Sequence, residues 1–289
     1  MVSIIAAIIG IIIVFFLCVM VYDCNRFVVT EYEIRSKKLL KECTLILLSD
    51  LHGKSYGTDS KVLLNKIDEI APDVILAAGD IITADKSSRY NKAAALLERL
   101  AVKYPLYYGL GNHEARLRED IQEFGDLYYK YEERLHEAGI APLINEAVLL
   151  MASNIRVLGL DIGKDCYRRF YKFPVERAYL VSMLGSPRED MFQILIAHNP
   201  DYFEEYEAWG ADLVVSGHVH GGLIRLPYIG GIISPKLTFF PEYDGGIYTK
   251  GNCSMVVSRG LGTHTLPIRI FNPGEMVVIH LKPDTDKED

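Results

Sequence analysis

Short apolar runs that end in Asp, Asn or His recur along this chain, and they restrict its fold more than any other feature. Continuous apolar runs of this length are typical of strands buried on both faces. Helical spacing separates the first three runs, so the chain is predicted to be an α/β protein whose polar clusters gather beyond the carboxyl ends of its strands. The clusters are Asp50-Leu51-His52, Gly79-Asp80, Gly111-Asn112-His113-Glu114, Ala197-His198-Asn199 and Gly217-His218-Val219-His220.

The same pattern predicts regular structure over most of the chain. Helices are expected at 59–70 and 91–102, and the charged, Tyr-rich stretch 116–139 is expected to be helical. The density of later strands indicates a second sheet, so the fold should contain two packed mixed β-sheets flanked by helices. Strands are expected at 44–48, 73–78, 106–110, 155–160, 193–197, 212–216, 255–258 and 276–281.

The N-terminus predicts one transmembrane helix. The first 22 residues carry no charged side chain, and 4–21 is almost wholly aliphatic or aromatic. A span needs about 20 apolar residues, with roughly 17 as the lower end. No Lys or Arg precedes the run and no small-residue cleavage site follows it, which favours an uncleaved anchor over a signal peptide. The predicted division is an anchor at 1–25, a catalytic domain at 26–283 and a charged tail at 284–289.

Charge constrains both orientation and partners. The positive-inside tendency predicts a single-pass membrane protein with its catalytic domain in the cytoplasm, because basic residues follow the apolar run and none precedes it. The formal net charge of −7 supplies no basic surface for phosphate backbones, so no nucleic-acid partner is expected. The basic residues after the run are Arg26, Arg35, Lys37, Lys38 and Lys41.

The polar clusters have the composition of a metal site, and they hold five of the chain's eight histidines. On an extended segment, residues two apart point to one side, so Asp-x-His and His-x-His pairs are each expected to face one ion. Glycines before Asp80, Asn112 and His218 are expected to let these loops approach closely. Carboxylate, imidazole and amide ligands without thiolate suit Mn, Fe, Zn, Co or Ni. Seven such ligands exceed one coordination sphere, so two divalent transition-metal ions are expected.

This set of motifs resembles the calcineurin-like metallophosphoesterases, whose pattern is Asp-x-His, Gly-Asp, Gly-Asn-His-Asp/Glu, His and Gly-His-x-His. The resemblance covers about 45–281 and is closest to the small membrane-associated branch. It implies a four-layer sandwich and a hydrolase that cleaves a phosphoester or pyrophosphate through a hydroxide bridging two metals. It further implies that Asp50, His52 and His220 hold the first ion, Asp80 bridges, Asn112, His198 and His218 hold the second, and His113 is catalytic without being a ligand.

Three residues beside the motifs have open or secondary roles. Glu114 is expected either to orient His113 or to be an exposed carboxylate with no such task. Asn199 is expected to cap the helix that starts near Pro200. Thr83 stands where the purple acid phosphatases carry an iron-binding tyrosine, so the resemblance does not extend to an iron–tyrosinate site.

An apolar, aromatic loop at 223–240 follows the last predicted ligand. It is either a packed connection or a wall that holds a lipid or enters a bilayer. With the anchor, it makes a lipid-linked phosphoester or pyrophosphate a candidate substrate. Arg225, Arg259 and Arg269 are candidates for contacting its phosphate, or are ordinary ion pairs. The alternatives are a non-catalytic membrane-tethered scaffold of the same fold, against which the complete ligand set argues, and a phosphodiesterase acting on soluble nucleotides.

Overall fold

Two six-stranded sheets pack face to face in the computed structural model, which describes residues 2–87, 89–168, 171–235, 237–263 and 266–284. The first sheet runs in the order β1 (Phe27–Ser36), β14 (Gly274–Pro283), β2 (Cys43–Leu48), β3 (Val74–Ala78), β4 (Leu106–Gly109), β5 (Pro142–Leu143). The second runs in the order β12 (Gly246–Lys250), β13 (Cys253–Val257), β9 (Leu213–Ser216), β8 (Phe192–Ala197), β7 (Ile155–Leu160), β6 (Glu146–Leu150). A separate hairpin consists of β10 (Arg225–Leu226) and β11 (Gly230–Gly231).

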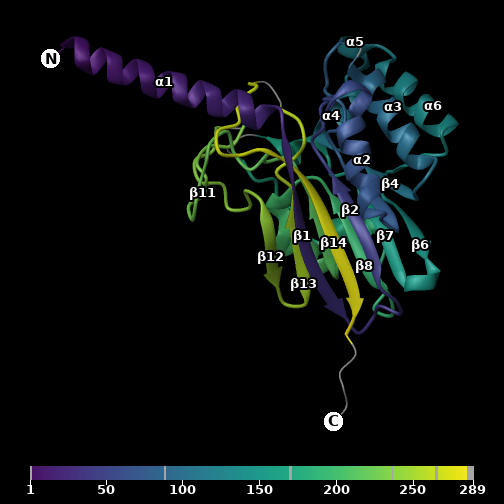
Figure 1. Cartoon of the computed structure of the whole chain (residues 1–289). Helices are drawn as coiled ribbons and strands as arrows, with labels where there is room; N and C mark the ends of the chain where they lie inside the picture. The colour runs from purple at the N-terminus through teal and green to yellow at the C-terminus, as the bar shows by residue number, and fades with distance from the viewer. Residues whose placement is uncertain (1, 88, 169–170, 236, 264–265, 285–289) are drawn as a thin grey trace.

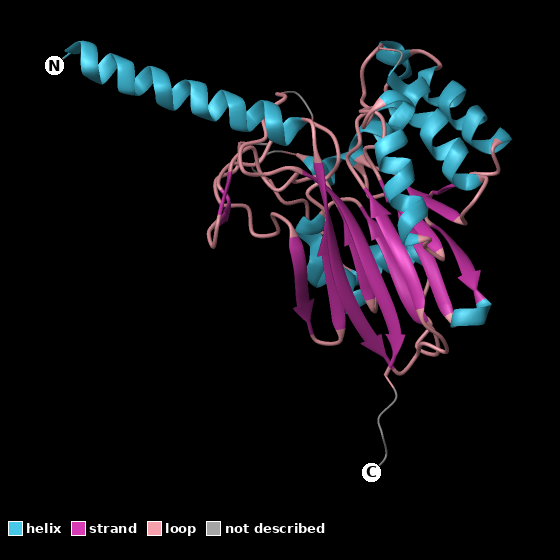
Figure 2. Ribbon diagram, in the orientation of Figure 1, coloured by secondary structure: helices cyan, strands magenta, loops and turns pink. Residues whose placement is uncertain are grey.

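Helices cover the outer face of each sheet, as Figure 2 shows. One apolar cluster lies between the sheets, and one lies on each outer face. The predicted arrangement of two packed sheets flanked by helices is therefore confirmed. The first sheet is covered by α2 (Lys61–Ile70), α3 (Arg89–Ala101), α4 (Asn112–Glu119), α5 (Ile121–Phe124) and α6 (Leu127–Glu137), and the second by α7 (Arg177–Leu184) and α8 (Phe203–Trp209).

Strand direction brings the polar clusters to one edge of the sandwich, here called the site edge. Strands β2, β3 and β4 are parallel, so they end together. His198 directly follows β8. Its Nδ1 atom lies 2.7 Å from the carbonyl oxygen of Ala78, the last residue of β3. The carboxyl ends of the two sheets therefore meet at the site edge.

The helix α1 (Val2–Cys24) precedes the sandwich and extends away from it (Figure 1). It has 23 residues and is long and apolar enough to cross a membrane. Its last turn is fixed to the domain, since Asp23 is buried, pairs with Arg26 and accepts a hydrogen bond from the backbone N–H of Asn272. The predicted N-terminal apolar helix is confirmed.

Several elements differ from those predicted. The pattern does not predict β1, β6 or β12, which lie at sheet edges and are exposed or only partly buried along most of their length. The helix expected from residue 59 begins at Lys61, because Asp59 and Ser60 have left-handed backbone angles in a preceding 3-10 turn. The predicted tail lies outside the described residues from 285 onward.

Candidate metal centre

The loops after β2, β3, β4, β8 and β9 bring their Asp and His residues together at the site edge. Among the described residues, three groups have potential ligand atoms within 4.8 Å of one another. The first group contains the three residues expected to hold the first ion. The third contains the expected bridging residue with two residues expected to hold the second ion, and the second group includes His113. The groups are Asp50–His52–His220, His52–Asp80–His113 and Asp80–His198–His218.

Distances between these atoms suit a shared ion. The Nε2 atoms of His52 and His220 lie 3.3 Å apart, and His220 Nε2 lies 3.2 Å from Asp50 Oδ1. His198 Nε2 lies 3.2 Å from Asp80 Oδ2. Two atoms each about 2.0–2.1 Å from a tetrahedral ion are separated by about 3.3 Å. The side chains are therefore spaced as ligands of one ion would be.

The backbone at these residues is turned rather than extended. Asp50, His52, Asp80, His218 and His220 all have positive φ angles between 49° and 73°. The expectation that Asp-x-His and His-x-His lie on extended segments is therefore wrong, and left-handed turns aim both side chains inward instead. Such a conformation costs about 1–3 kcal/mol at a non-glycine residue and persists where surrounding structure enforces it.

Two glycines allow the ligand loops to touch. A Cβ on Gly111 would lie 2.2 Å from Asp80 Oδ1, and one on Gly217 would lie 2.2 Å from Asp50 Oδ2. Neither distance is compatible with a side chain, so the predicted close approach at these glycines is confirmed. The glycines act here mainly by leaving space, since neither has a positive φ.

The buried Asp and His charges of the cluster do not balance at every group. Burial raises the pKa of Asp50 to about 7, with His198 opposing and Asp80 adding to that rise. Burial also acts to raise the pKa of Asp80, but His198 and His113 hold it well below its usual value. Burial would lower the pKa of His198, yet Asp80 outweighs this and raises it to about 9. A bound cation would relieve this imbalance, so the residues fit a metal.

The side-chain oxygen of Asn112 also fits a ligand. It is buried and has no hydrogen-bond partner among the described residues. Buried polar atoms are rarely left in this state without a functional reason. Asn112 lies between Gly111 and His113, and the His113 N–H donates to Asp80 Oδ1 at 2.9 Å.

Backbone contacts give the Nδ1 atoms of two histidines opposite roles. His198 Nδ1 faces the carbonyl of Ala78, which can only accept, so Nδ1 carries a proton and Nε2 is the nitrogen that faces Asp80. His113 Nδ1 accepts from the N–H of Ala84 at 2.9 Å, so in the neutral ring the proton is on Nε2. The Nε2 atom of His113 lies 3.9 Å from Asp80 Oδ2. His198 therefore directs Nε2 toward Asp80, and neutral His113 presents an N–H at its Nε2.

Glu114 has neither of its predicted roles. It is fully buried, and it contacts backbone N–H groups rather than His113. Burial and then Asp80 raise its pKa, whereas hydrogen bonds from Tyr108 and Ile82 oppose the rise. It occupies the third position of α4, where Glu often reaches back to the start of the helix, and this was the available sequence signal. Its donors are the N–H groups of Asp80 (2.9 Å), Gly111 (3.0 Å) and Ile82 (3.1 Å) and the Tyr108 hydroxyl (2.7 Å).

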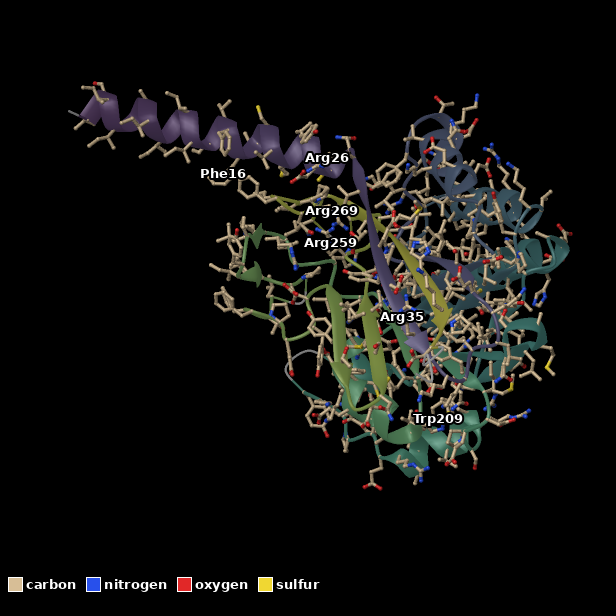
Figure 3. All side chains as sticks on the ribbon, turned by 60° about the horizontal axis from the view of Figure 1, so that its bottom comes forward. Phe16, Arg26, Arg35, Trp209, Arg259 and Arg269 are labelled. Carbon is tan, nitrogen blue, oxygen red and sulfur yellow. The ribbon has the colours of Figure 1, made fainter. Side chains whose placement is uncertain are left out.

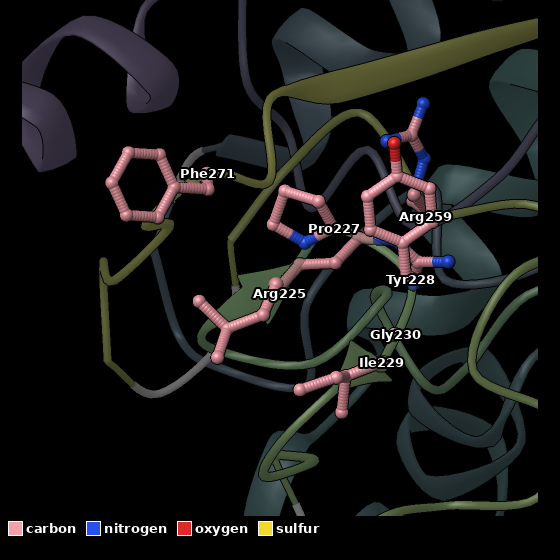
Figure 4. Close-up of a pocket in the computed structure, with 8 residues that line it drawn as sticks. Arg225, Pro227, Tyr228, Ile229, Gly230, Arg259 and Phe271 are labelled. Carbon is pink, nitrogen blue, oxygen red and sulfur yellow. The ribbon is translucent and has the colours of Figure 1, made fainter.

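The three candidate arginines separate into two kinds. Arg269 is buried, and its guanidinium donates to main-chain carbonyls that include those of Gly262 and Gly260, so its candidacy as a substrate contact is corrected to a structural role (Figure 3). Arg225 and Arg259 line one cavity of about 610 Å³ beside the β10–β11 hairpin (Figure 4). Both are paired there, with Asp244 at 2.9 Å and Glu275 at 2.7 Å respectively.

Other contacts at the site edge were not predicted. Thr83 Oγ1 lies 3.2 Å from His52 Nδ1, and the Tyr167 ring lies 5.2 Å from that of His218. Asn272 donates to the carbonyl of His220 at 2.7 Å, and Lys54 Nζ to that of Cys24. These residues are isolated in loops, where no periodicity or motif indicates a role. The helix cap predicted for Asn199 is confirmed, since its side chain accepts from Asp201 N.

Comparisons with known proteins point to one family. The family model described as calcineurin-like phosphoesterase matches residues 43–222. The uncharacterized metallophosphoesterase YkuE of Bacillus subtilis is 29% identical over 266 residues, covering 88% of this chain and 85% of the relative. The phosphodiesterase YaeI of Escherichia coli is 27% identical over 225 residues, covering 76% of this chain and 75% of the relative. The crystal structure of TT1561 of Thermus thermophilus has a TM-score of 0.45 at 15% identity, covering 76% of this chain and 89% of that one.

An α/β sandwich with an Asp/His cluster at its strand ends is the arrangement of a metal-dependent hydrolase. The chain belongs to the calcineurin-like phosphoesterase family. Members of this family hydrolyse phosphoesters with divalent metal ions, and the Asp and His groups at the site edge supply suitable ligands.

Proposed function

We propose that the chain is a binuclear phosphoesterase that cleaves a phosphoester or pyrophosphate at a membrane surface. The main support is the relation between the groups of ligand atoms. Asp80 shares one group with His52 and another with His198 and His218, which is what a carboxylate bridging two ions requires. Asp50, His52 and His220 would hold one ion.

The second ion would be held by Asn112, His198 and His218. The buried oxygen of Asn112 supports this assignment, as does the contact of His198 Nδ1 with the Ala78 carbonyl, which leaves Nε2 as the nitrogen that could bind an ion. Imidazole and oxygen ligands without thiolate suit Mn, Fe, Zn, Co or Ni. Such ions, when bound, would supply a water nucleophile near neutral pH and offset charge on the phosphoryl group.

His113 is proposed as the catalytic group that is not a ligand. A metal ligand must present a nitrogen lone pair, whereas the His113 Nε2 carries a proton when Nδ1 accepts from Ala84. That N–H can donate to a phosphoryl oxygen or protonate the leaving group, a task typically worth ~10²–10⁴ in rate. The His113 ring lies 5.0 Å from that of His52, beside the proposed first ion.

Helix α1 supports attachment to a membrane, and the cavity lined by Arg225 and Arg259 supports a lipid-linked substrate. We propose that α1 is a transmembrane anchor and that the domain lies in the cytoplasm, because five basic residues follow the helix closely. Arg225 and Arg259 share their cavity with apolar side chains, which suits a lipid-linked phosphate or diphosphate. A reporter fused after Asp289 that is active only outside the membrane would refute the orientation.

The test is metal analysis followed by activity on defined substrates. The purified full chain should hold two transition-metal ions after loading, and Asp80→Ala should lose both because the carboxylate is shared. A ceiling of one ion in the wild type would refute the binuclear site. Activity should then be compared on a monoester, a diester and a pyrophosphate, each in acylated and deacylated form. A loaded protein inactive on all of them would favour the scaffold alternative.

A further inference from the structure

A small apolar surface projects from the domain beside α1, here called the tip surface: Leu226, Tyr228, Ile229 and Phe271. All four side chains line the same cavity in Figure 4, and all are exposed. Tyr228 is fully exposed and has a φ of 67°, an unfavourable conformation for a bulky residue. Exposed clusters of apolar side chains often mark surfaces that bind another protein or a membrane.

One residue of the tip surface, Phe271, contacts the middle of α1 rather than its end. The Phe271 ring lies 6.2 Å from the ring of Phe16 and 6.5 Å from that of Phe15. Phe16 precedes the last helical residue, Cys24, by eight positions. The domain therefore reaches about 12 Å along the helix, at 1.5 Å per residue.

This reach can be compared with the thickness of a bilayer. The 23 residues of α1 extend about 34 Å, and the hydrocarbon layer is about 30 Å thick. If the whole excess of about 4 Å emerged on the domain side, Phe16 would still lie about 8 Å inside the hydrocarbon. A typical tilt of about 20° shortens these lengths by less than a tenth. The Phe271 ring lies 6.2 Å from that of Phe16, so it would still be inside the hydrocarbon even if this whole distance ran toward the headgroups.

We infer that the tip surface is inserted into the hydrocarbon of the same bilayer that α1 spans. The domain would then hold the membrane at two places, through the helix and through the tip. The same placement puts Asp23 and Arg26, which pair at the helix end, at the level of the lipid headgroups. Arg225 and Arg259 line the same cavity and are paired with Asp244 and Glu275, so neither approaches the apolar layer as an unpaired charge. The inference rests on the part of the proposed function that places α1 in a membrane, and it is independent of catalysis.

Quenching of tryptophan by lipids with brominated acyl chains tests the inference on the full chain in phosphatidylcholine vesicles. The sequence contains one tryptophan, Trp209, which is buried at the far end of the domain in Figure 3 and gives a constant background. Single variants Phe271→Trp and Tyr228→Trp should lose most of their added emission in brominated vesicles. Tyr228 is fully exposed, so its substitution should not disturb folding.

Two further variants separate the tip from the anchor. Ile8→Trp reports on α1 itself, and Leu149→Trp reports on an exposed apolar position of β6, away from the site edge. Quenching at Ile8→Trp with none at either tip variant beyond Leu149→Trp would overturn the inference while leaving the anchor intact. Absence of quenching at Ile8→Trp would overturn both. Blue-shifted emission at the tip without quenching would assign this surface to a second copy of the chain and refute lipid insertion.

Discussion

Replacing Glu114 by Gln should show that this buried carboxylate holds the two central ligand loops. Its four donors divide between its oxygens, with Asp80 and Gly111 on one and Ile82 and Tyr108 on the other. The amide oxygen of a glutamine can accept from one pair of donors, but its NH₂ group then faces the other pair. In the better orientation the Tyr108 hydroxyl rotates to accept, and the Ile82 N–H alone loses its acceptor.

One unsatisfied buried donor costs about 1–3 kcal/mol, and the less favourable orientation would cost about twice that. The free energy of unfolding should therefore fall by at least about 1–3 kcal/mol, a decrease of roughly 2–12 °C in Tm for a chain of this size. Because the residue supports Asp80, metal affinity should also fall by about 10–100-fold. Thermal unfolding with and without chelator and competitive metal titration measure these effects.

Glu132→Gln is the matched control, since Glu132 accepts one hydrogen bond, from Tyr128, that an amide oxygen can retain. If Glu114→Gln matched this control in both assays, the supporting role would be wrong.

Three other substitutions test separate parts of the site. His113→Ala should keep both ions and lower kcat by ~10²–10⁴, because it removes the Nε2 donor; loss of an ion would make it a ligand. Gly111→Ala should abolish metal binding because its Cβ would overlap Asp80, whereas Gly163→Ala, whose Cβ would meet nothing closer than 3.9 Å, should resemble wild type in the same titration. Arg269→Met should lower the free energy of unfolding by about 2–5 kcal/mol, since several carbonyls lose their donor, while exposed Arg35→Met should change little in urea unfolding.

The sequence allowed the fold and the candidate ligands to be predicted because both follow from short-range patterns. Buried strands such as β2 and β8 are continuous apolar runs, and the Asp and His residues come directly after them. The reason given for the Asp-x-His spacing was nevertheless wrong, since the backbone of Asp50 and His52 is left-handed. Local spacing pointed to residues that lie close together in the structure, without fixing their conformation.

The side chains that hold the loops of the site in place, Glu114 and Arg269, could not be predicted in the same way. Glu114 belongs to a recognised motif, but its partners lie on three segments whose approach depends on the packing of β3 and α4. Arg269 looked like a substrate contact because an isolated arginine in a loop gives no sign of burial. Its role emerges only from the folded chain, in which main-chain carbonyls seven to ten residues earlier, including that of Gly262, meet its guanidinium.

One strand that the sequence pattern does not indicate decides where α1 lies relative to the metal centre. β1 is parallel to β14, and β14 is antiparallel to β2, so β1 starts at the site edge, where β2 ends. The helix that leads into β1 must therefore leave the domain beside the Asp and His cluster. Asn272 joins the two directly, since its N–H donates to Asp23 and its side chain donates to the carbonyl of His220. Had β1 run the other way, a membrane at α1 would face the opposite end of the sheet, and a substrate held in that membrane would have to leave it to reach the metals.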